Sequence, residues 1–188
     1  MAAGHPFEVD ADSVSPESRT SFDKLLADRI VLVAGKIDDK TATLTIAQLL
    51  FLAHQDATAP ICVYVNSPGG VVTSALGIYD TMLDVAPPVH TTCVGKAAGM
   101  AVLLLAAGEP GQRAAISEAS MWWTALTGFT PDTDIATAEV ARLHETLDAC
   151  SRRHTGRSLQ TLESAGRVDA AGALALGIVD RIIRHRSS

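Results

Sequence analysis

The sequence predicts an α/β fold built from repeated βαβ units, and three observations lead to that prediction. Short β-branched strands alternate with helical segments along most of the 188 residues, a pattern typical of parallel sheets with helical crossovers. Two of the predicted strands run directly into glycine-rich turns that open helices. A chain of this length also buries about 70 % of its unfolded surface without a disulfide or metal. We therefore expect one domain at residues 21–188, preceded by an arm at residues 1–20.

Composition limits the function classes open to the chain. Hydrophobic residues make up 47 % and charged residues 19 %, with a net charge of −6, which argues against disorder and against a surface for nucleic acid or membrane. The N-terminus lacks the pattern of a signal peptide, and the most apolar stretch, Ala97–Ala107, is too short to span a bilayer. Cys62, Cys93 and Cys150 fit no zinc or disulfide pattern. We expect a cytoplasmic protein with no metal or cofactor.

The first elements follow from local patterns. Residues 1–20 are rich in Ser, Asp, Glu and Pro and have no periodicity, which predicts the arm. A short helix is expected around Lys24–Ala27, and the β-branched run Arg29–Ala34 predicts a strand that ends at a glycine. Asp39 then opens an amphipathic helix, in which apolar residues recur at helical spacing. Those residues are Leu44, Ile46, Leu49, Leu50 and Ala53.

Two further strand–helix units form the middle of the chain. Ile61–Val65 predicts a strand that stops at the sequence NSPGG, and the helix Thr73–Leu83 that follows ends before a proline pair. Val89–Val94 predicts the next strand. Gly95 is then expected to turn the chain into an apolar helix at Ala98–Ala107.

The last third is built around one long helix, Asp134–His154. Apolar residues line one face of this helix and charged residues the other, which predicts an amphipathic element. Shorter elements surround it, and Asp169 is placed to cap the last helix. The short elements are strands at Ala114–Ile116, Met121–Ala125 and Ile178–Ile183, and helices at Leu159–Ala165 and after Asp169.

The two glycine-rich turns lie at the C-terminal ends of adjacent predicted strands, the edge of a parallel sheet where ligands and catalytic groups gather. The glycines of NSPGG would free backbone N–H groups for an oxyanion, although a plain tight turn explains this pentapeptide equally well. In the second turn, GKAAGM, small residues flank Gly99 as they flank the nucleophile of a strand-to-helix elbow. Glycine, however, has no side chain that could act as a nucleophile.

A set of motifs in fixed order carries a resemblance to a known family. After NSPGG come IYDTM, CVGKAAGM, LLLAAGEPGQR, HTGRSL and GIVD. Together they resemble the proteolytic subunit of the Clp protease, ClpP, from about Leu25 to Ile183. The resemblance implies a ClpP/crotonase-like fold in which the helix Asp134–His154 protrudes as a handle. It also implies self-association into a stacked double ring of heptamers.

The resemblance implies a Ser-His-Asp triad, and this sequence departs from it at every member. Gly99 stands at the position of the nucleophilic serine. Counting along the family pattern places Thr124 at the position of the histidine base and Ala165 at that of the aspartate. The backbone N–H groups of Gly70 and Met100 would remain as oxyanion donors. Without a nucleophile there is no acyl transfer, and oxyanion donors alone leave about 10³–10⁴-fold catalysis over water.

Three functions stay open on this evidence. The first is a catalytically inactive pseudo-peptidase with a structural or regulatory role, assembled with itself or with an active paralogue in mixed rings. The second is a serine- or threonine-type peptidase with a relocated nucleophile, in which Lys96 would serve Thr124 as a base. The third is a module that binds a peptide or acyl group at the glycine turns without turnover.

Two further sets of residues concern the catalytic pocket and the binding of a partner protein. Trp122 and Trp123 occupy adjacent strand positions and so face opposite sides. One of them would fill the vacated catalytic pocket while the other packs in the core, or both are ordinary core residues. Cys62, Tyr64 and Ala114 match the family's hydrophobic dock for an AAA+ unfoldase. Only one of these three is aromatic, so we expect unfoldase docking to be weakened.

Overall fold

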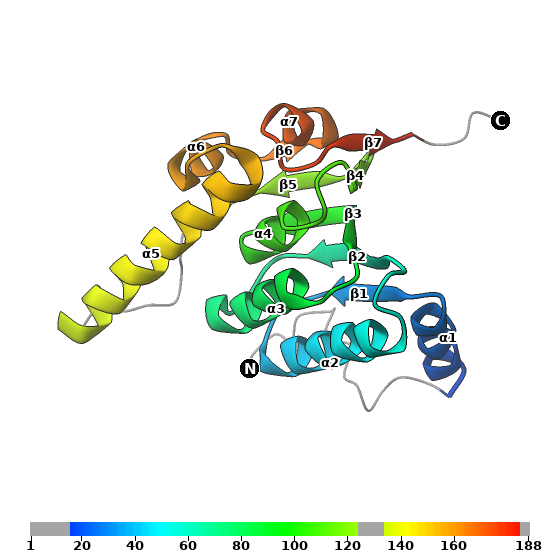
Figure 1. Ribbon diagram of the computed structural model, residues 1–188. Helices are drawn as coiled ribbons and strands as arrows, with labels where there is room; N and C mark the ends of the chain where they lie inside the picture. The colour runs from blue at the N-terminus through cyan, green and yellow to red at the C-terminus, as the bar shows by residue number, and fades with distance from the viewer. Residues whose placement is uncertain (1–15, 124–133, 185–188) are drawn as a thin grey trace, which may run out of the picture.

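The computed structural model describes residues 16–123 and 134–184 of the chain (Figure 1). Its helices are α1 (Pro16–Ala27), α2 (Asp39–Gln55), α3 (Val72–Asp84), α4 (Met100–Ala106), α5 (Asp134–Thr155), α6 (Leu159–Ser164) and α7 (Ala170–Ala175). Its strands are β1 (Ile30–Ala34), β2 (Ile61–Ser67), β3 (Val89–Ala98), β4 (Arg113–Ile116), β5 (Ser120–Trp122), β6 (Val168–Asp169) and β7 (Arg181–Ile183). No helix of the described ranges has both the length and the apolar character to cross a membrane.

The parallel sheet that the sequence predicts is present. Five strands pair in the order β1-β2-β3-β4-β7, all parallel. β5 continues the sheet from the far end of β3, again in parallel, and β6 pairs antiparallel with β5. In Figure 1 the long helix α5 projects away from this body, as the handle of the expected fold would. The α/β prediction is therefore confirmed.

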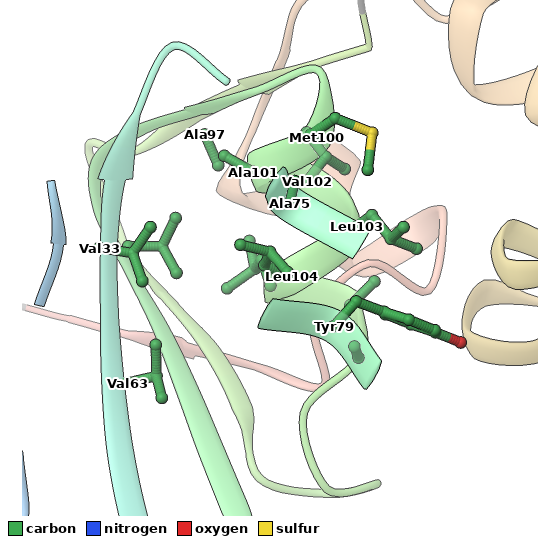
Figure 2. Close-up of a cluster of buried hydrophobic side chains, with 14 of the residues drawn as sticks. Val33, Val63, Ala75, Tyr79, Ala97, Met100, Ala101, Val102, Leu103 and Leu104 are labelled. Carbon is green, nitrogen blue, oxygen red and sulfur yellow. The ribbon is translucent and has the colours of Figure 1, made fainter. Parts of the chain in front are cut away.

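The sheet has one buried face and one open face. On the buried face, alternate valines of β1 and β2 pack against α3 and α4, and Figure 2 shows Val33 and Val63 on the sheet side of Leu104. Helix α4 is buried along its whole length because it lies inside this layer. The opposite face of the sheet carries half-exposed side chains and no covering helix among the described residues. We call it the open face; its residues are Leu32, Cys62, Tyr64, Thr92, Ile116 and Ile183.

Helix α2 corrects part of the predicted apolar stripe. The helix begins at Asp39 as expected, with the Asp38 side chain accepting a hydrogen bond from the N–H of Thr41 at 2.8 Å. Leu49 is buried, but Leu44 and Leu50 are 61 % and 50 % exposed. The helix has more apolar residues than its core-facing side can bury, so Leu44 and Leu50 are exposed to solvent. With Phe51, these two leucines form what we call the α2 patch.

The end of β3 also differs from the prediction. Gly95 was expected to end the strand, yet pairing continues to Ala98, and α4 starts only at Met100. Gly95 has a φ of +84°, and the pairing of β2 with β3 shifts register between Val65 and Ser67. This glycine therefore makes a bulge and not a turn. The first helix begins earlier than expected, at Pro16, and β6 was not predicted at all.

A buried arginine ties the C-terminal segment to the core. The guanidinium of Arg113 donates to the carboxylate of Asp180 through Nε at 2.8 Å and through Nη2. Its Nη1 donates to the carbonyls of His154 at 2.7 Å and Gly177 at 2.9 Å. The hydrogen bonds from Arg113 hold the pKa of Asp180 below its usual value. Nη1 also donates to the carbonyl of Ala106 at 3.3 Å, so strand β4, helix α4, the end of α5 and the residue before β7 meet at one side chain.

Candidate functional site

The two glycine-rich turns contact each other through their backbones. A Cβ on Gly69 would lie 2.5 Å from the carbonyl oxygen of Ala98 and 3.3 Å from the nitrogen of Met100. A Cβ on Gly70 would lie 2.0 Å from the carbonyl oxygen of Ile37. Neither position has room for a side chain, which explains the paired glycines. The prediction that both turns share one edge of the sheet is confirmed.

The pairing around Gly70 shows which way its own N–H group points. The N–H of Ile37 donates to the carbonyl of Gly69 at 2.9 Å, and the N–H of Val71 donates to the carbonyl of Ile37 at 2.8 Å. In parallel pairing, the residue between two such partners turns its own N–H and C=O to the other side. Ile37 follows β1, so the other side of Gly70 is the side of β3 and the elbow.

The strand-to-helix turn at Gly99 has the geometry of a nucleophile elbow. Its φ is 50° and its ψ is −124°, a combination that L side chains adopt only under strain. Its N–H donates to the carbonyl of Trp122 at 3.0 Å, and its carbonyl accepts from Val102 at 3.0 Å. Met100 is the first residue of α4, so its N–H has no partner within the helix. The elbow backbone is thus present, but the residue at its apex has no side chain.

The two tryptophans are separated in the way their adjacent positions predict. Trp122 pairs with Ala98 beside the elbow, and the guanidinium carbon of Arg167 lies 4.0 Å from the centre of its ring. Trp123 is only 7 % exposed and belongs to the core cluster. Its indole Nε1 is buried and has no hydrogen-bond partner within the described part of the chain. Trp122 is therefore the partly exposed tryptophan, and Trp123 is the core residue.

The other two triad-equivalent positions add no catalytic group that the structure describes. Ala165 is exposed at the C-terminal end of α6, and Thr124 lies outside the described residues. Asp169 accepts a hydrogen bond from the N–H of Gly172 at 2.8 Å, so the prediction that it caps the last helix is confirmed. Lys96 is exposed and pairs in register with Ser120. Across residues 16–123 and 134–184, no three metal-ligating side chains gather.

The three dock positions come together on the open face of the sheet. Tyr64, Thr92 and Ala114 are consecutive partners across β2, β3 and β4, and Cys62 lies two residues along β2 from Tyr64. Tyr64 is 37 % exposed, Cys62 is half-buried, and Ala114 is fully buried. The surface at this point therefore offers one aromatic ring, with small side chains beside it.

The sequence did not reveal a hydrogen bond between α3 and α5. The hydroxyl of Tyr79 lies 2.8 Å from Nε2 of His154, and the two rings meet edge to face with centroids 5.5 Å apart. Burial, and then the charges of Arg153 and Arg113, lower the pKa of His154 to about 4. Burial raises the pKa of Tyr79. Both residues lie in motifs noted in the sequence, IYDTM and HTGRSL, but their spacing gives no sign that they meet.

A comparison with protein families agrees with the motifs. A family model described as Clp protease matches residues 13–186, which is nearly the whole chain.

Proposed function

The chain belongs to the Clp protease family, and from that premise we propose that it is a catalytically inactive subunit with a structural or regulatory role in a Clp-type ring. Members of this family form rings and work with AAA+ unfoldases. The observation that carries the proposal is Gly99. The backbone there has the elbow conformation, and the position that needs an attacking oxygen has only hydrogen.

Two other nucleophilic residues near the elbow, Cys93 and Ser67, are unsuited to replace a serine. Cys93, on the same strand, is fully buried, and burial raises the pKa of its thiol to about 12. A thiol in that state supplies almost no thiolate at neutral pH. The hydroxyl of Ser67 is buried and accepts a hydrogen bond from the N–H of Gly69 at 3.0 Å, so it serves to hold the turn.

Lys96 is a poor candidate for the base of a relocated nucleophile. Catalytic lysines are held neutral by burial, whereas Lys96 is exposed. Its neighbour in the register is Ser120. The alternative of a serine- or threonine-type peptidase therefore has less support than inactivity.

Trp122 supports an occupied cleft in place of a catalytic one. Its backbone pairs with Ala98 of the elbow strand, and Arg167 covers one face of its ring at 4.0 Å. Such a cation–π contact contributes roughly 0.5–1 kcal/mol at an exposed site. A peptide that entered along the elbow would have to displace this pair. The third function, peptide binding without turnover, is for this reason the second candidate only.

Two separate apolar surfaces support assembly into a ring. The α2 patch lies on the helical side of the sheet, and the open face with Tyr64 and Ile183 lies on the other side. A contact between two different patches joins copies head to tail, and such contacts generate closed rings when the rotation allows. The dock positions lie on this same open face, where Cys62 and Ala114 supply no aromatic ring, so docking of an unfoldase loop on this subunit is weakened.

Labelling of the purified chain tests inactivity. We expect no adduct with a fluorophosphonate probe and no cleavage of a fluorogenic peptide, while an active paralogue run in parallel gives both. A covalent adduct on the isolated chain would overturn the proposal in favour of a relocated nucleophile. Saturable binding of the peptide without cleavage would favour the third function. Recovery of an active paralogue with the tagged chain would support mixed rings.

A further inference from the structure

A cavity of about 390 Å³ lies at the opposite end of β3 from the elbow. It is formed by the C-terminal end of α3, the segment 85–89, the turn 107–110 and the last turn of α5. Its wall combines polar groups with apolar side chains, and its volume falls in the range of small-molecule sites. The apolar wall includes Met82, Val85, Pro87, Val89 and Ala107.

Three charged or polar side chains reach this cavity: Glu109, Arg153 and His154. Nε2 of His154 is engaged with the hydroxyl of Tyr79. Among the described residues, nothing is hydrogen-bonded to its Nδ1. When the Tyr79 hydroxyl donates to Nε2, the neutral imidazole carries its proton on Nδ1, where it is a donor available to a ligand.

Two arginines act on His154 at the cavity wall. The charges that act on this imidazole are those of Arg153 and Arg113, and both disfavour its protonation. Arg113 is compensated by the carboxylate of Asp180. Arg153, in contrast, takes part in none of the ion pairs found within the described residues, which join Arg113 to Asp180, Arg142 to Glu139 and Arg152 to Asp148. The wall thus combines an uncompensated cation with an imidazole donor.

We propose that this cavity binds a small carboxylate with an apolar tail, the carboxylate contacting Arg153 and Nδ1 of His154 and the tail lying along the apolar part of the wall, where Leu83 is exposed. A guanidinium is the donor best matched to a carboxylate. Glu109 lies at the same cavity and acts against a negative ligand, so it limits affinity. The inference is independent of the elbow and of any peptidase activity.

Calorimetric titration of the full chain with octanoate tests this proposal, with octanol and octylamine as matched probes of the same tail. We expect octanoate to bind with one site per chain and the other two at least about tenfold more weakly, since each lacks the charge-assisted hydrogen bonds. Equal binding of octanoate and octanol, or no binding of octanoate, overturns the proposal.

Charge variants locate the site. Arg153→Gln is expected to weaken octanoate about tenfold, and Glu109→Gln is expected to strengthen it. Arg152→Gln is the matched control, because Arg152 is exposed on the same helical turn but is paired with Asp148 and does not line the cavity. The same loss in Arg152→Gln as in Arg153→Gln, or weaker binding in Glu109→Gln, refutes the site. Melting temperatures of the three variants confirm that each is folded.

Discussion

At the scale of single residues, the chain keeps the backbone of a catalytic elbow and omits its chemistry. Gly99 has a φ of 50°, and its N–H and carbonyl are both hydrogen-bonded, so the conformation is set by its surroundings. The adjacent turn is held as firmly, since Gly69 and Gly70 leave no space for a Cβ. A residue with a side chain at position 99 would be strained in this conformation, which glycine adopts freely.

Replacing two glycines tests that statement. Gly99→Ala should lower the free energy of unfolding by about 1–3 kcal/mol, because alanine disfavours the positive φ. Gly77→Ala is the matched change, inside helix α3, where the new Cβ meets only Ile46 at an ordinary 3.4 Å. It should raise stability by roughly 0.5–1 kcal/mol. Urea unfolding measures both, and effects of the same sign would contradict the elbow strain.

His154 gives the fold a pH dependence on the acid side of neutral. Its pKa in the fold is about 4, whereas the unfolded chain takes up the proton at about pH 6.5. The unfolded state therefore binds more protons between these values, and the free energy of unfolding falls as the pH drops from about 6.5 to about 4. The loss is on the order of 1 kcal/mol once solvent screening at a half-buried site is allowed for.

His154→Gln should remove that slope, as measured by urea unfolding at a series of pH values. His144→Gln, on an exposed position of the same helix, is the control and should keep it. An unchanged slope in His154→Gln would show that another group titrates in this range. The contribution of Asp180, whose pKa is lowered, is a separate one that is lost only below about pH 3.9.

At the scale of elements, sequence patterns gave the type and order of the strands and helices because each is bounded by glycine, proline or a capping residue. They were less reliable where pairing with a distant strand decides where an element ends or whether it forms. Gly95 looks like the end of a strand, yet pairing with β5 extends β3 past it. β6 has two residues and exists only through its partner, so no local pattern could predict it.

One arginine secures the end of α2. The side chain of Arg29 donates to four carbonyls at 2.9–3.1 Å, those of Leu52, Asp56, Ala59 and Pro60. Arg29→Met should lower the free energy of unfolding by about 2–3 kcal/mol, because these carbonyls lose their donor. Arg142→Met removes an exposed ion pair with Glu139 and should cost under about 0.5 kcal/mol. Similar losses in chemical denaturation would show that Arg29 has no special role.

At the scale of the whole molecule, the α/β architecture was predictable, but the surfaces were not. The alternation of strands and helices fixes the layers, whereas exposure depends on which side of α2 the core covers. Leu44 and Leu50 were expected in the apolar stripe and instead form the α2 patch with Phe51. For the candidate site, motif order placed Gly99, Gly70 and Met100 correctly at one edge. The contact between Tyr79 and His154 joins residues 75 positions apart in the sequence, so no local pattern predicts it.

Mixing two surface variants tests the head-to-tail ring. Phe51→Glu spoils the α2 patch and Tyr64→Glu spoils the open face, so each variant alone should sediment as a monomer. Mixed in equal amounts, they should form dimers and no larger species, because each supplies the patch that the other lacks. Leu174→Glu, an exposed leucine outside both surfaces, should still form rings. Analytical ultracentrifugation distinguishes these outcomes, and monomers only in the mixture would argue against the contact.

The Arg113–Asp180 contact has a consequence for local opening of the sheet. Asp180 stands directly before β7, which pairs with β4 at the edge of the sheet. Fraying that lifts β7 away from β4 would also draw the carboxylate from the guanidinium of Arg113. An unpaired buried charge is costly, so this edge strand is expected to open only together with the segment around it, and its amides should exchange slowly with solvent.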